Sequence, residues 1–186
     1  MSGRTIGVVL AAGAGTRFGE PKAPVVVGGE RLVDRAVRVL REGGCDEVVV
    51  ILGAWEGEVP GALVVVNHGW EEGMGSTLRI GLKWARACGG DRALVTLVDL
   101  PGLSAEAVRR VVEAPGVIVQ ASFDGAPGHP VRFNRELFDP VIARVSGDRG
   151  ARDFLRGRDD IAVVEVGDVA SGADLDTPVA DPAGQP

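Results

Sequence analysis

Short runs of Val, Ile and Leu alternate with longer amphipathic segments, and this pattern constrains the fold of the 186-residue chain more than any other feature. The runs are almost continuously apolar, as expected for strands that are covered on both faces of a parallel sheet. The candidate strands are Thr5–Ala11, Glu47–Leu52, Leu63–Val66, Arg92–Val98, Gly116–Ala121 and Ile161–Val166. The alternation predicts an α/β fold, namely one Rossmann-like, doubly wound domain with a mostly parallel sheet.

The segments between these runs have the spacing of helices. Arg31–Arg41 places its apolar residues at helical intervals, and a shorter helix is expected from Arg149 to Arg156. Three polar residues are expected to cap the other helices at their N-termini: Ser76 for a helix through Arg86, Ser104 for Ala105–Glu113, and Asn134 for Arg135–Val145.

The chain shows no internal repeat and no change of composition that marks a second domain. We therefore expect one domain over residues 1–178, followed by a flexible tail over 179–186 that is rich in Ala, Pro and Gly. In an open parallel sheet, ligands bind at the carboxyl ends of the strands, beside the point where the strand order reverses. The functional site is expected there.

Charge and composition exclude several classes of partner. A formal net charge of -6 argues against a broad surface for DNA or RNA. No stretch approaches the roughly 20 apolar residues of a membrane span. Cys45 and Cys88 lack the spacing of a metal site, and we interpret them as small buried apolar residues in a reducing compartment. A cytoplasmic protein without nucleic-acid or membrane partners is expected.

A glycine-rich loop follows directly after the first strand, from Ala11 to Lys22. Gly13, Gly15 and Gly19 allow backbone N–H groups to approach an anion closely, because no Cβ is in the way. Arg17 and Lys22 add two cations that suit the charge of a triphosphate. An ordinary glycine-rich surface turn is the alternative, but the two cations after a first strand favour phosphate binding.

Two common phosphate-binding loops do not fit this segment. A P-loop ends in Gly-Lys-Ser/Thr, whereas Lys22 lies between Pro21 and Ala23. The dinucleotide fingerprint needs glycine where this chain has Phe18, and it needs an acidic residue after the second strand, where the chain has Ile51-Leu-Gly53.

The loop resembles the signature of the nucleotidyltransferases related to the molybdenum cofactor enzymes MobA and MocA. The resemblance begins with Leu10-Ala-Ala-Gly-Ala-Gly-Thr-Arg-Phe-Gly19 together with Lys22. Further segments extend it along almost the whole chain: Asn67–Leu82, Val98-Asp-Leu-Pro-Gly-Leu103, Gly128-His-Pro-Val-Arg-Phe133, Ser146–Arg152 and Asp174-Leu-Asp-Thr-Pro178. The segments Gly128–Phe133 and Ser146–Arg152 are more similar to the MocA branch than to MobA.

The resemblance implies a fold of the nucleotide-diphospho-sugar transferase type and a transfer of CMP from CTP to the phosphate of a molybdopterin-type acceptor, with release of pyrophosphate. In-line displacement of this kind depends on positioning and charge stabilisation and needs no protein nucleophile. Asp99 after the fourth candidate strand, and Asp176 near the C-terminus, are the expected ligands of Mg²⁺, because hard cations prefer carboxylate oxygens.

The resemblance also implies roles for individual residues. Arg17, Lys22 and Asp99 are the expected catalytic residues. The nucleotide is expected to contact Leu10, Ala11, Ala12, Gly13, Gly15, Arg17, Lys22, Asn67, Ser76 and Asp99. The acceptor is expected to contact His129, Arg149, Arg152 and Asp176.

Structural alternatives exist for several of these residues. Asp99 could be a turn residue before Pro101, Ser76 a helix cap, and His129 a turn histidine bonded to backbone. The two arginines could form exposed ion pairs with Asp148 and Asp153.

Alternatives also exist for the function. Leu10-Ala-Ala-Gly13 favours cytosine in this family, where guanylyl enzymes more often carry Leu-Ala-Gly-Gly, but Ala23-Pro-Val-Val26 departs from the usual continuation, so GTP remains an alternative donor. A different class is an NAD(P)H-dependent oxidoreductase of the nicotine blue reductase type. A third is a nucleotide-binding chaperone that delivers cofactor to a molybdenum hydroxylase, which is also the expected recipient of the product.

Overall fold

Strand β1 (Thr5–Ala11) lies in the interior of the sheet between β4 and β6, and all of its residues are buried. The computed structural model describes residues 3–176, so the expected tail over 179–186 lies outside the described residues. Within that range the main sheet has seven strands in the order β5-β4-β1-β6-β8-β7-β9. The other strands are β4 (Glu47–Leu52), β5 (Leu63–Val66), β6 (Arg92–Leu97), β7 (Ile118–Phe123), β8 (Ala126–Asn134) and β9 (Ile161–Glu165).

The chain winds outward from β1 in both directions. It first adds β4 and β5 in parallel on one side, and then returns to place β6 parallel to β1 on the other side. The strand order therefore reverses between β1 and β6, which puts the carboxyl ends of these two strands beside the switch point. The predicted doubly wound, mostly parallel α/β fold is confirmed.

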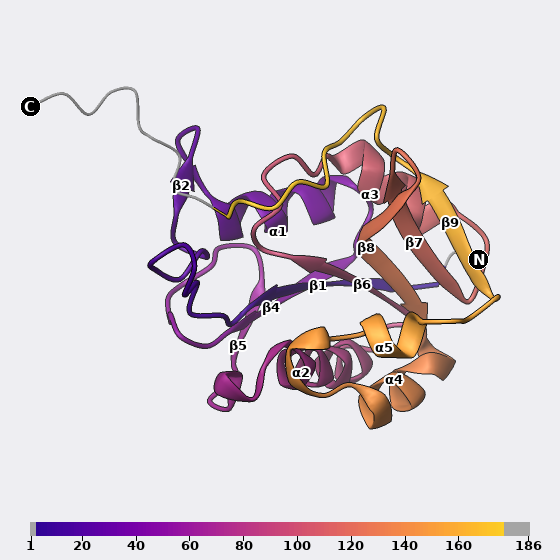
Figure 1. The fold of residues 1–186 in the computed structure, drawn as a ribbon, viewed down its shortest axis with the longest axis horizontal. Helices are drawn as coiled ribbons and strands as arrows, with labels where there is room; N and C mark the ends of the chain where they lie inside the picture. Colours follow the sequence, from indigo (N-terminus) through magenta and orange to yellow (C-terminus); the bar gives the residue numbers. More distant parts are fainter. Residues whose placement is uncertain (1–2, 177–186) are drawn as a thin grey trace, which may run out of the picture.

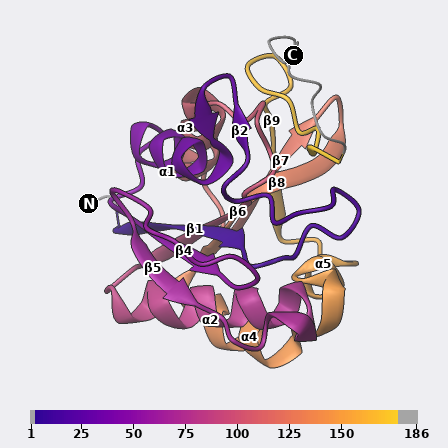
Figure 2. The same cartoon turned by 90° about the vertical axis from the view of Figure 1, so that its left-hand side faces the viewer.

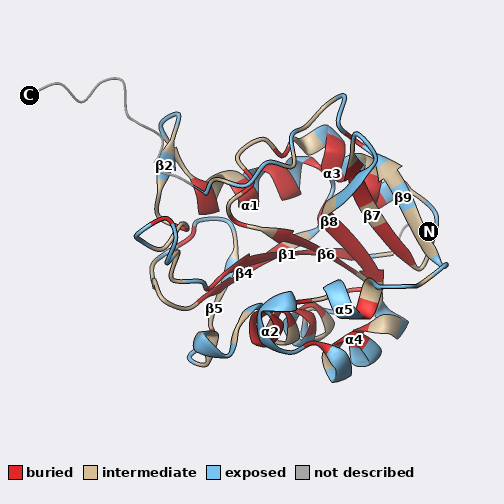
Figure 3. Ribbon diagram, in the orientation of Figure 1, coloured by how far each residue is buried: buried red, intermediate tan, exposed pale blue. Residues whose placement is uncertain are grey.

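Helices cover both faces of the sheet (Figures 1 and 2). One face carries α1 (Leu32–Glu42) and α3 (Ala105–Glu113), and the other carries α2 (Met74–Ala87), α4 (Phe138–Arg144) and α5 (Arg152–Leu155). Burial is concentrated in the central strands and on the helix faces turned toward them (Figure 3). Within residues 3–176, no helix has the length and apolar character needed to cross a membrane.

A short hairpin and three 3₁₀ turns complete the fold of residues 3–176. A two-stranded hairpin of β2 (Val26–Val27) and β3 (Glu30–Arg31) follows the glycine loop. Three 3₁₀ turns, η1 (Trp70–Glu72), η2 (Arg135–Leu137) and η3 (Gly147–Arg149), precede α2, α4 and α5. The helix expected from Arg149 to Arg156 is thus divided between η3 and the four-residue α5.

Strand β8 was not among the expected strands, although it is the longest in the sheet. It runs antiparallel to both β6 and β7, and so makes the sheet mixed. The strand is difficult to predict from the sequence because it contains Pro127, Gly128 and Pro130, and proline and glycine are normally excluded from central strands. The structure accommodates them where the β7–β8 register shifts between Gln120 and Ser122.

The three expected N-caps have different outcomes. Ser104 is confirmed, because its side chain accepts a hydrogen bond from the backbone N–H of Ala107. The prediction for Ser76 is wrong: α2 begins at Met74, after Gly73 in a left-handed conformation with φ 96°. Asn134 is also wrong as a side-chain cap, because it makes no capping hydrogen bond and the chain enters η2 before α4.

Both cysteines are free thiols. Cys45 is buried, and burial raises the pKa of its thiol to about 12, which keeps it protonated and unreactive. Cys88 is half-buried. The interpretation as a small buried residue therefore holds fully for Cys45 and only in part for Cys88.

Arg132 on β8 is a buried cation that holds the C-terminal end of α3 to the sheet. Its guanidinium donates to the backbone carbonyls of Val112 at 2.7 Å, Ala114 at 2.8 Å and Gly116 at 2.6 Å. The side chain is only 2% exposed, and desolvation lowers its pKa to about 10. Carbonyl groups at a helix end lack partners within the helix, so Arg132 satisfies groups that would otherwise be buried without a hydrogen bond.

We expect the substitution Arg132→Met to lower the free energy of unfolding by about 3 kcal/mol, because it leaves several buried carbonyls without a donor. Chemical denaturation measures this loss. Arg109→Met is the matched control, since Arg109 lies on α3 but is about half exposed and pairs with Glu106 on the surface. The control should lose less than about 1 kcal/mol. Equal losses in the two variants would contradict the role of Arg132.

Candidate active site

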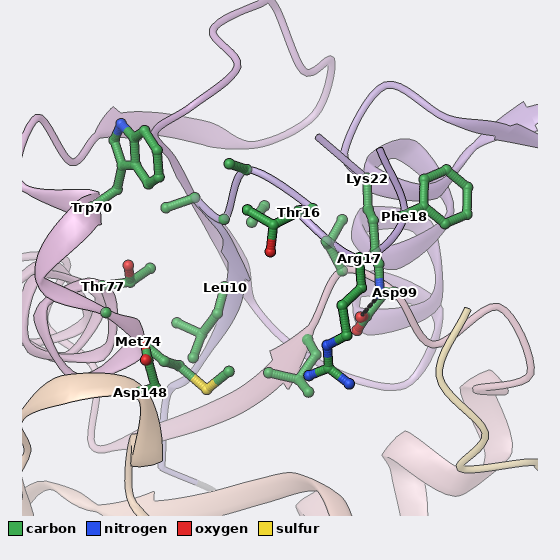
Figure 4. A pocket seen from close by; sticks show the side chains of 18 of the residues that line it. Leu10, Thr16, Arg17, Phe18, Lys22, Trp70, Met74, Thr77, Asp99 and Asp148 are labelled. Atoms are coloured by element: carbon green, nitrogen blue, oxygen red, sulfur yellow. Dashed lines mark hydrogen bonds and ion pairs between the residues drawn. The ribbon is translucent and has the colours of Figure 1, made fainter. Parts of the chain in front are cut away.

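A cleft of about 530 Å³ opens at the carboxyl ends of β1 and β6, beside the switch point (Figure 4). Its walls come from the glycine loop, the start of α2, the end of β6, η3 and the segment before the end of the described chain. The lining residues are Leu10, Ala11, Ala12, Gly13, Ala14, Gly15, Thr16, Arg17, Phe18, Lys22, Trp70, Glu71, Gly73, Met74, Thr77, Leu97, Val98, Asp99, Asp148, Asp174 and Asp176.

The glycine loop closes on itself and leaves one side open to the cleft. The backbone N–H of Gly19 donates to the carbonyl of Gly15 at 2.7 Å. Gly15 has φ 61°, and a Cβ at this position would lie 1.9 Å from the carbonyl oxygen of Glu20, so only glycine fits the turn. A Cβ at Gly13, in contrast, would meet nothing within 4 Å. The loop therefore presents open backbone to a ligand in the cleft.

Lys22 is the cation that joins this loop to the acidic corner of the cleft. Its Nζ lies 2.7 Å from Oδ2 of Asp99, at the end of β6, and 3.4 Å from Oδ1 of Asp176. The Lys22 and Asp99 side chains are only 14% and 18% exposed, so their charges interact with little screening by solvent. The backbone N–H of Leu175 donates to the carbonyl of Asp99 at 2.9 Å and fixes the last described segment against β6.

The cleft has a deficit of positive charge. Its lining contains the two cations Arg17 and Lys22 but five carboxylates, three of which are Asp99, Asp174 and Asp176. Burial, together with repulsion from Asp99 and Asp176, raises the pKa of the Asp174 carboxyl. A triphosphate would add further negative charge, so binding it here requires additional cations.

The acidic corner fits a divalent cation that the substrate helps to hold. Within residues 3–176, no three His, Cys, Asp or Glu side chains converge as a complete metal centre. Asp99 and Asp176 nevertheless offer carboxylate oxygens that converge on Lys22 Nζ. Mg²⁺ is typically bound by one or two carboxylates plus substrate phosphates and water, which matches this incomplete set of ligands.

The opposite end of the cleft combines apolar side chains with the carboxylates Glu71 and Asp148. Trp70 from η1, and Met74 and Thr77 from α2, lie across the cleft from Lys22, Phe18 and Asp99, with Leu10 and Thr16 between the two groups (Figure 4). The sequence-based hypothesis gave the peptide groups from Gly73 to Gly75 a place near the nucleotide or the acceptor, but it gave no role to the side chains of Trp70 and Met74. The sequence shows that these two side chains are aromatic and thioether groups. No local sequence pattern, however, indicates that a tryptophan of η1 lies beside the glycine loop.

Asn67 supports this end of the cleft from behind. Its amide Nδ2 donates to Ser76 Oγ at 2.9 Å and to Thr77 Oγ1 at 3.1 Å, and its Oδ1 accepts from the backbone N–H of Gly69 at 2.9 Å. Asn67 is 3% exposed and Ser76 is 5% exposed, and neither lines the cleft. Their expected contacts with nucleotide remain predictions, and the structure places them one layer behind Thr77.

The expected acceptor residues do not all meet at the cleft. Asp176 lines it, but His129, Arg149 and Arg152 do not. His129 is half-buried on β8, its Nδ1 lies 3.4 Å from the carbonyl of Val95, and burial lowers the pKa of its imidazole. Arg149 is exposed and pairs with Asp153 at 3.5 Å, which is one of the ion pairs considered as the alternative. Acceptor contacts of these three residues remain predictions.

The described chain matches the model of one protein family over residues 7–163, namely the MobA-like NTP transferase domain. The chain therefore belongs to this family, and the predicted enzyme class, a nucleotidyltransferase, is confirmed.

Curated relatives carry different names. The chain is 39% identical to nicotine blue oxidoreductase of Paenarthrobacter nicotinovorans, over 92% of this chain and 91% of that protein. It is 30% identical to the purine catabolism protein PucB of Bacillus subtilis, over 93% and 92%, and 28% identical to a molybdenum cofactor guanylyltransferase of Rhodobacter capsulatus, over 77% and 70%.

Solved structures share the fold over most of this chain. Rv0371c of Mycobacterium tuberculosis H37Rv superposes with a TM-score of 0.80 at 28% identity, and covers 95% of this chain and 94% of its own. A complex of Rv0371c with manganese superposes with a TM-score of 0.72 at 25% identity, over 88% of each chain.

We expect Asn67→Ala to lower the free energy of unfolding by about 2 kcal/mol, because the amide makes three buried or part-buried hydrogen bonds. Thermal or chemical denaturation measures the loss. The control is His68→Ala, because His68 is the exposed neighbour of Asn67. If Asn67→Ala were as stable as the control but lost its affinity for nucleotide, Asn67 would be a binding residue instead of a support.

Proposed function

We propose that this protein is a Mg²⁺-dependent nucleotidyltransferase that transfers CMP from CTP to the phosphate of a molybdopterin-type acceptor and releases pyrophosphate. The observation that supports it most is the contact of Lys22 in the glycine loop with Asp99 at the end of β6, across the switch point of the sheet. Phosphate-binding and metal-binding chemistry thus meet at one place in a fold that belongs to the MobA-like family.

The residues of the cleft suit each part of this reaction. Arg17 and Lys22, together with the open backbone at Gly13, bind the phosphates of the donor. Asp99 and Asp176 would hold Mg²⁺, which neutralises phosphate charge when it is bound. Lys22 Nζ exchanges its carboxylate partners for phosphate oxygens. The terminal phosphate oxygen of the acceptor then attacks the α-phosphorus, and the bond to the bridging oxygen of the β-phosphate breaks.

Two further observations support a divalent cation. The acidic corner carries three carboxylates, Asp99, Asp174 and Asp176, which is more negative charge than Lys22 neutralises. The related Rv0371c structure is described as a complex with manganese. Because the family includes nucleotidyltransferases and carboxylates bind both ions, we assign the acidic corner of this cleft to Mg²⁺.

The choice of CTP rests on the sequence Leu10-Ala-Ala-Gly13, and all four of these residues line the cleft. The guanylyltransferase of Rhodobacter capsulatus, at 28% identity, keeps GTP as the nearest alternative donor. The recipient of the dinucleotide product is proposed to be a molybdenum hydroxylase.

A second candidate function is an NAD(P)H-dependent oxidoreductase, because the chain is 39% identical to a protein named nicotine blue oxidoreductase. Two features of the site weigh against it. β4 ends at Leu52 and is followed by Gly53, without the acidic residue that binds a ribose in dinucleotide folds, and Phe18 occupies the position of the third glycine.

We expect Asp99→Asn to reduce Mg²⁺-dependent pyrophosphate release from CTP and molybdopterin by about 100-fold, because it removes the carboxylate that holds the metal against the phosphates. Asp159→Asn is the matched control, since Asp159 is an exposed aspartate outside the cleft, and its rate should equal that of the unmodified protein. Full turnover by Asp99→Asn at the same Mg²⁺ concentration would contradict the metal assignment.

A further inference from the structure

The charge distribution of the cleft orients a bound nucleotide, if the proposed function is correct. The cations Arg17 and Lys22 and the carboxylates Asp99 and Asp176 lie at one end, so the triphosphate and its metal belong there. The heterocycle of the donor then extends toward the other end, between Leu10 and the wall formed by Trp70 and Met74 (Figure 4). Aromatic and thioether side chains suit a planar ring.

Besides Glu71 of η1, Asp148 is an ionisable side chain of the cleft lining that has no assigned role. It belongs to η3, lines the cleft and lies beside Met74 in Figure 4. Within residues 3–176 its carboxylate forms no hydrogen bond or ion pair. Its neighbour Arg149 forms an ion pair with Asp153 and not with Asp148. The carboxylate is therefore available to a ligand in the cleft.

Close backbone packing places η3, which carries this carboxylate, against the start of α2. A Cβ at Gly73 would lie 2.5 Å from Asp148 Oδ1, and a Cβ at Gly150 would lie 3.1 Å from the sulfur of Met74. Glycine at positions 73 and 150 thus allows η3 to lie directly against the start of α2. Asp148 consequently approaches the cleft from a packed segment, even though its side chain is exposed.

A carboxylate at this end of the cleft discriminates between heterocycles by their hydrogen-bonding edges. An ionised carboxylate only accepts hydrogen bonds. The 4-amino group of cytosine donates one, whereas uracil has a carbonyl oxygen at the same position, which repels a carboxylate. The amino groups of a pterin ring would offer similar chemistry. The pterin, however, belongs to the acceptor, and the reactive phosphate of the acceptor must reach the α-phosphate of the donor at the opposite end of the cleft. We therefore consider the donor base as the partner of Asp148.

We propose that Asp148 determines donor specificity by accepting a hydrogen bond from the exocyclic amino group of the nucleobase, and so selects CTP over UTP. This assignment rests on the proposed function, because it requires a nucleoside triphosphate in the cleft. The assignment adds a specificity residue from η3 to a nucleotide site that the sequence analysis predicted mainly on the glycine loop.

The test is the ratio of CTP to UTP affinity in saturating Mg²⁺, measured by isothermal titration calorimetry on the full chain. The unmodified protein should favour CTP by about tenfold or more, which corresponds to one well-placed hydrogen-bonding contact to a base. Asp148→Asn should bring the ratio close to one. The removal of a negative charge strengthens binding of both triphosphates equally and cancels in the ratio. Asp159→Asn, the control on the exposed surface, should keep the ratio of the unmodified protein.

The outcomes separate the specificity assignment from the proposed function. Tight binding of CTP with an unchanged ratio in Asp148→Asn would overturn the role of Asp148 and leave the transferase function intact. Weakened binding of free pterin by Asp148→Asn, with an unchanged nucleotide ratio, would likewise overturn the assignment to the donor base. Failure of the unmodified protein to bind any triphosphate with Mg²⁺ would overturn both proposals.

Discussion

The ion pair between Lys22 and Asp99 is the interaction on which the candidate site depends. It joins a loop after β1 to the end of β6 across 77 residues of sequence, and both side chains are largely buried. Parallel pairing of β1 with β6 brings the two carboxyl ends to the same edge of the sheet. Because Lys22 also approaches Asp176, three distant segments share one cation, and the segment from 171 to 176 is held where its carboxylates face the cleft.

Much of the fold was predictable from local patterns. Strands β1, β4 and β5 have the predicted bounds, because a nearly continuous run of Val, Ile and Leu between turn residues is typical of a strand in a parallel sheet. β8 was missed because its prolines and glycine locally oppose a strand, and pairing with β6 and β7 overrides that preference. The start of α2 was misplaced because Ser76 has the chemistry of a cap, while Gly73 supplies the backbone geometry.

Part of the candidate site was likewise predictable from the sequence, and part of it was not. The glycine loop, Lys22 and Asp99 were predictable because each follows a strand that ends at the switch point. Asp174, Trp70 and Asp148 were not, since their places in the cleft result from tertiary packing that no spacing encodes. The close fit of Asp148 against Gly73 illustrates this: the two residues are 75 positions apart, and only the contact of η3 with α2 brings them together. The relatives show why fold alone does not decide the chemistry, since similar chains carry the names of an oxidoreductase and a guanylyltransferase.

The central claim is that the cleft binds a metal–triphosphate and not a dinucleotide. Isothermal titration of CTP and NADPH, each with and without Mg²⁺, tests it most directly. The charge deficit of the cleft predicts that CTP binds measurably with Mg²⁺ and at least tenfold more weakly without it, because five carboxylates and two cations line the cleft. NADPH should show no comparable affinity. Tight, metal-independent binding of NADPH together with no binding of CTP would contradict the account and identify the protein as an oxidoreductase.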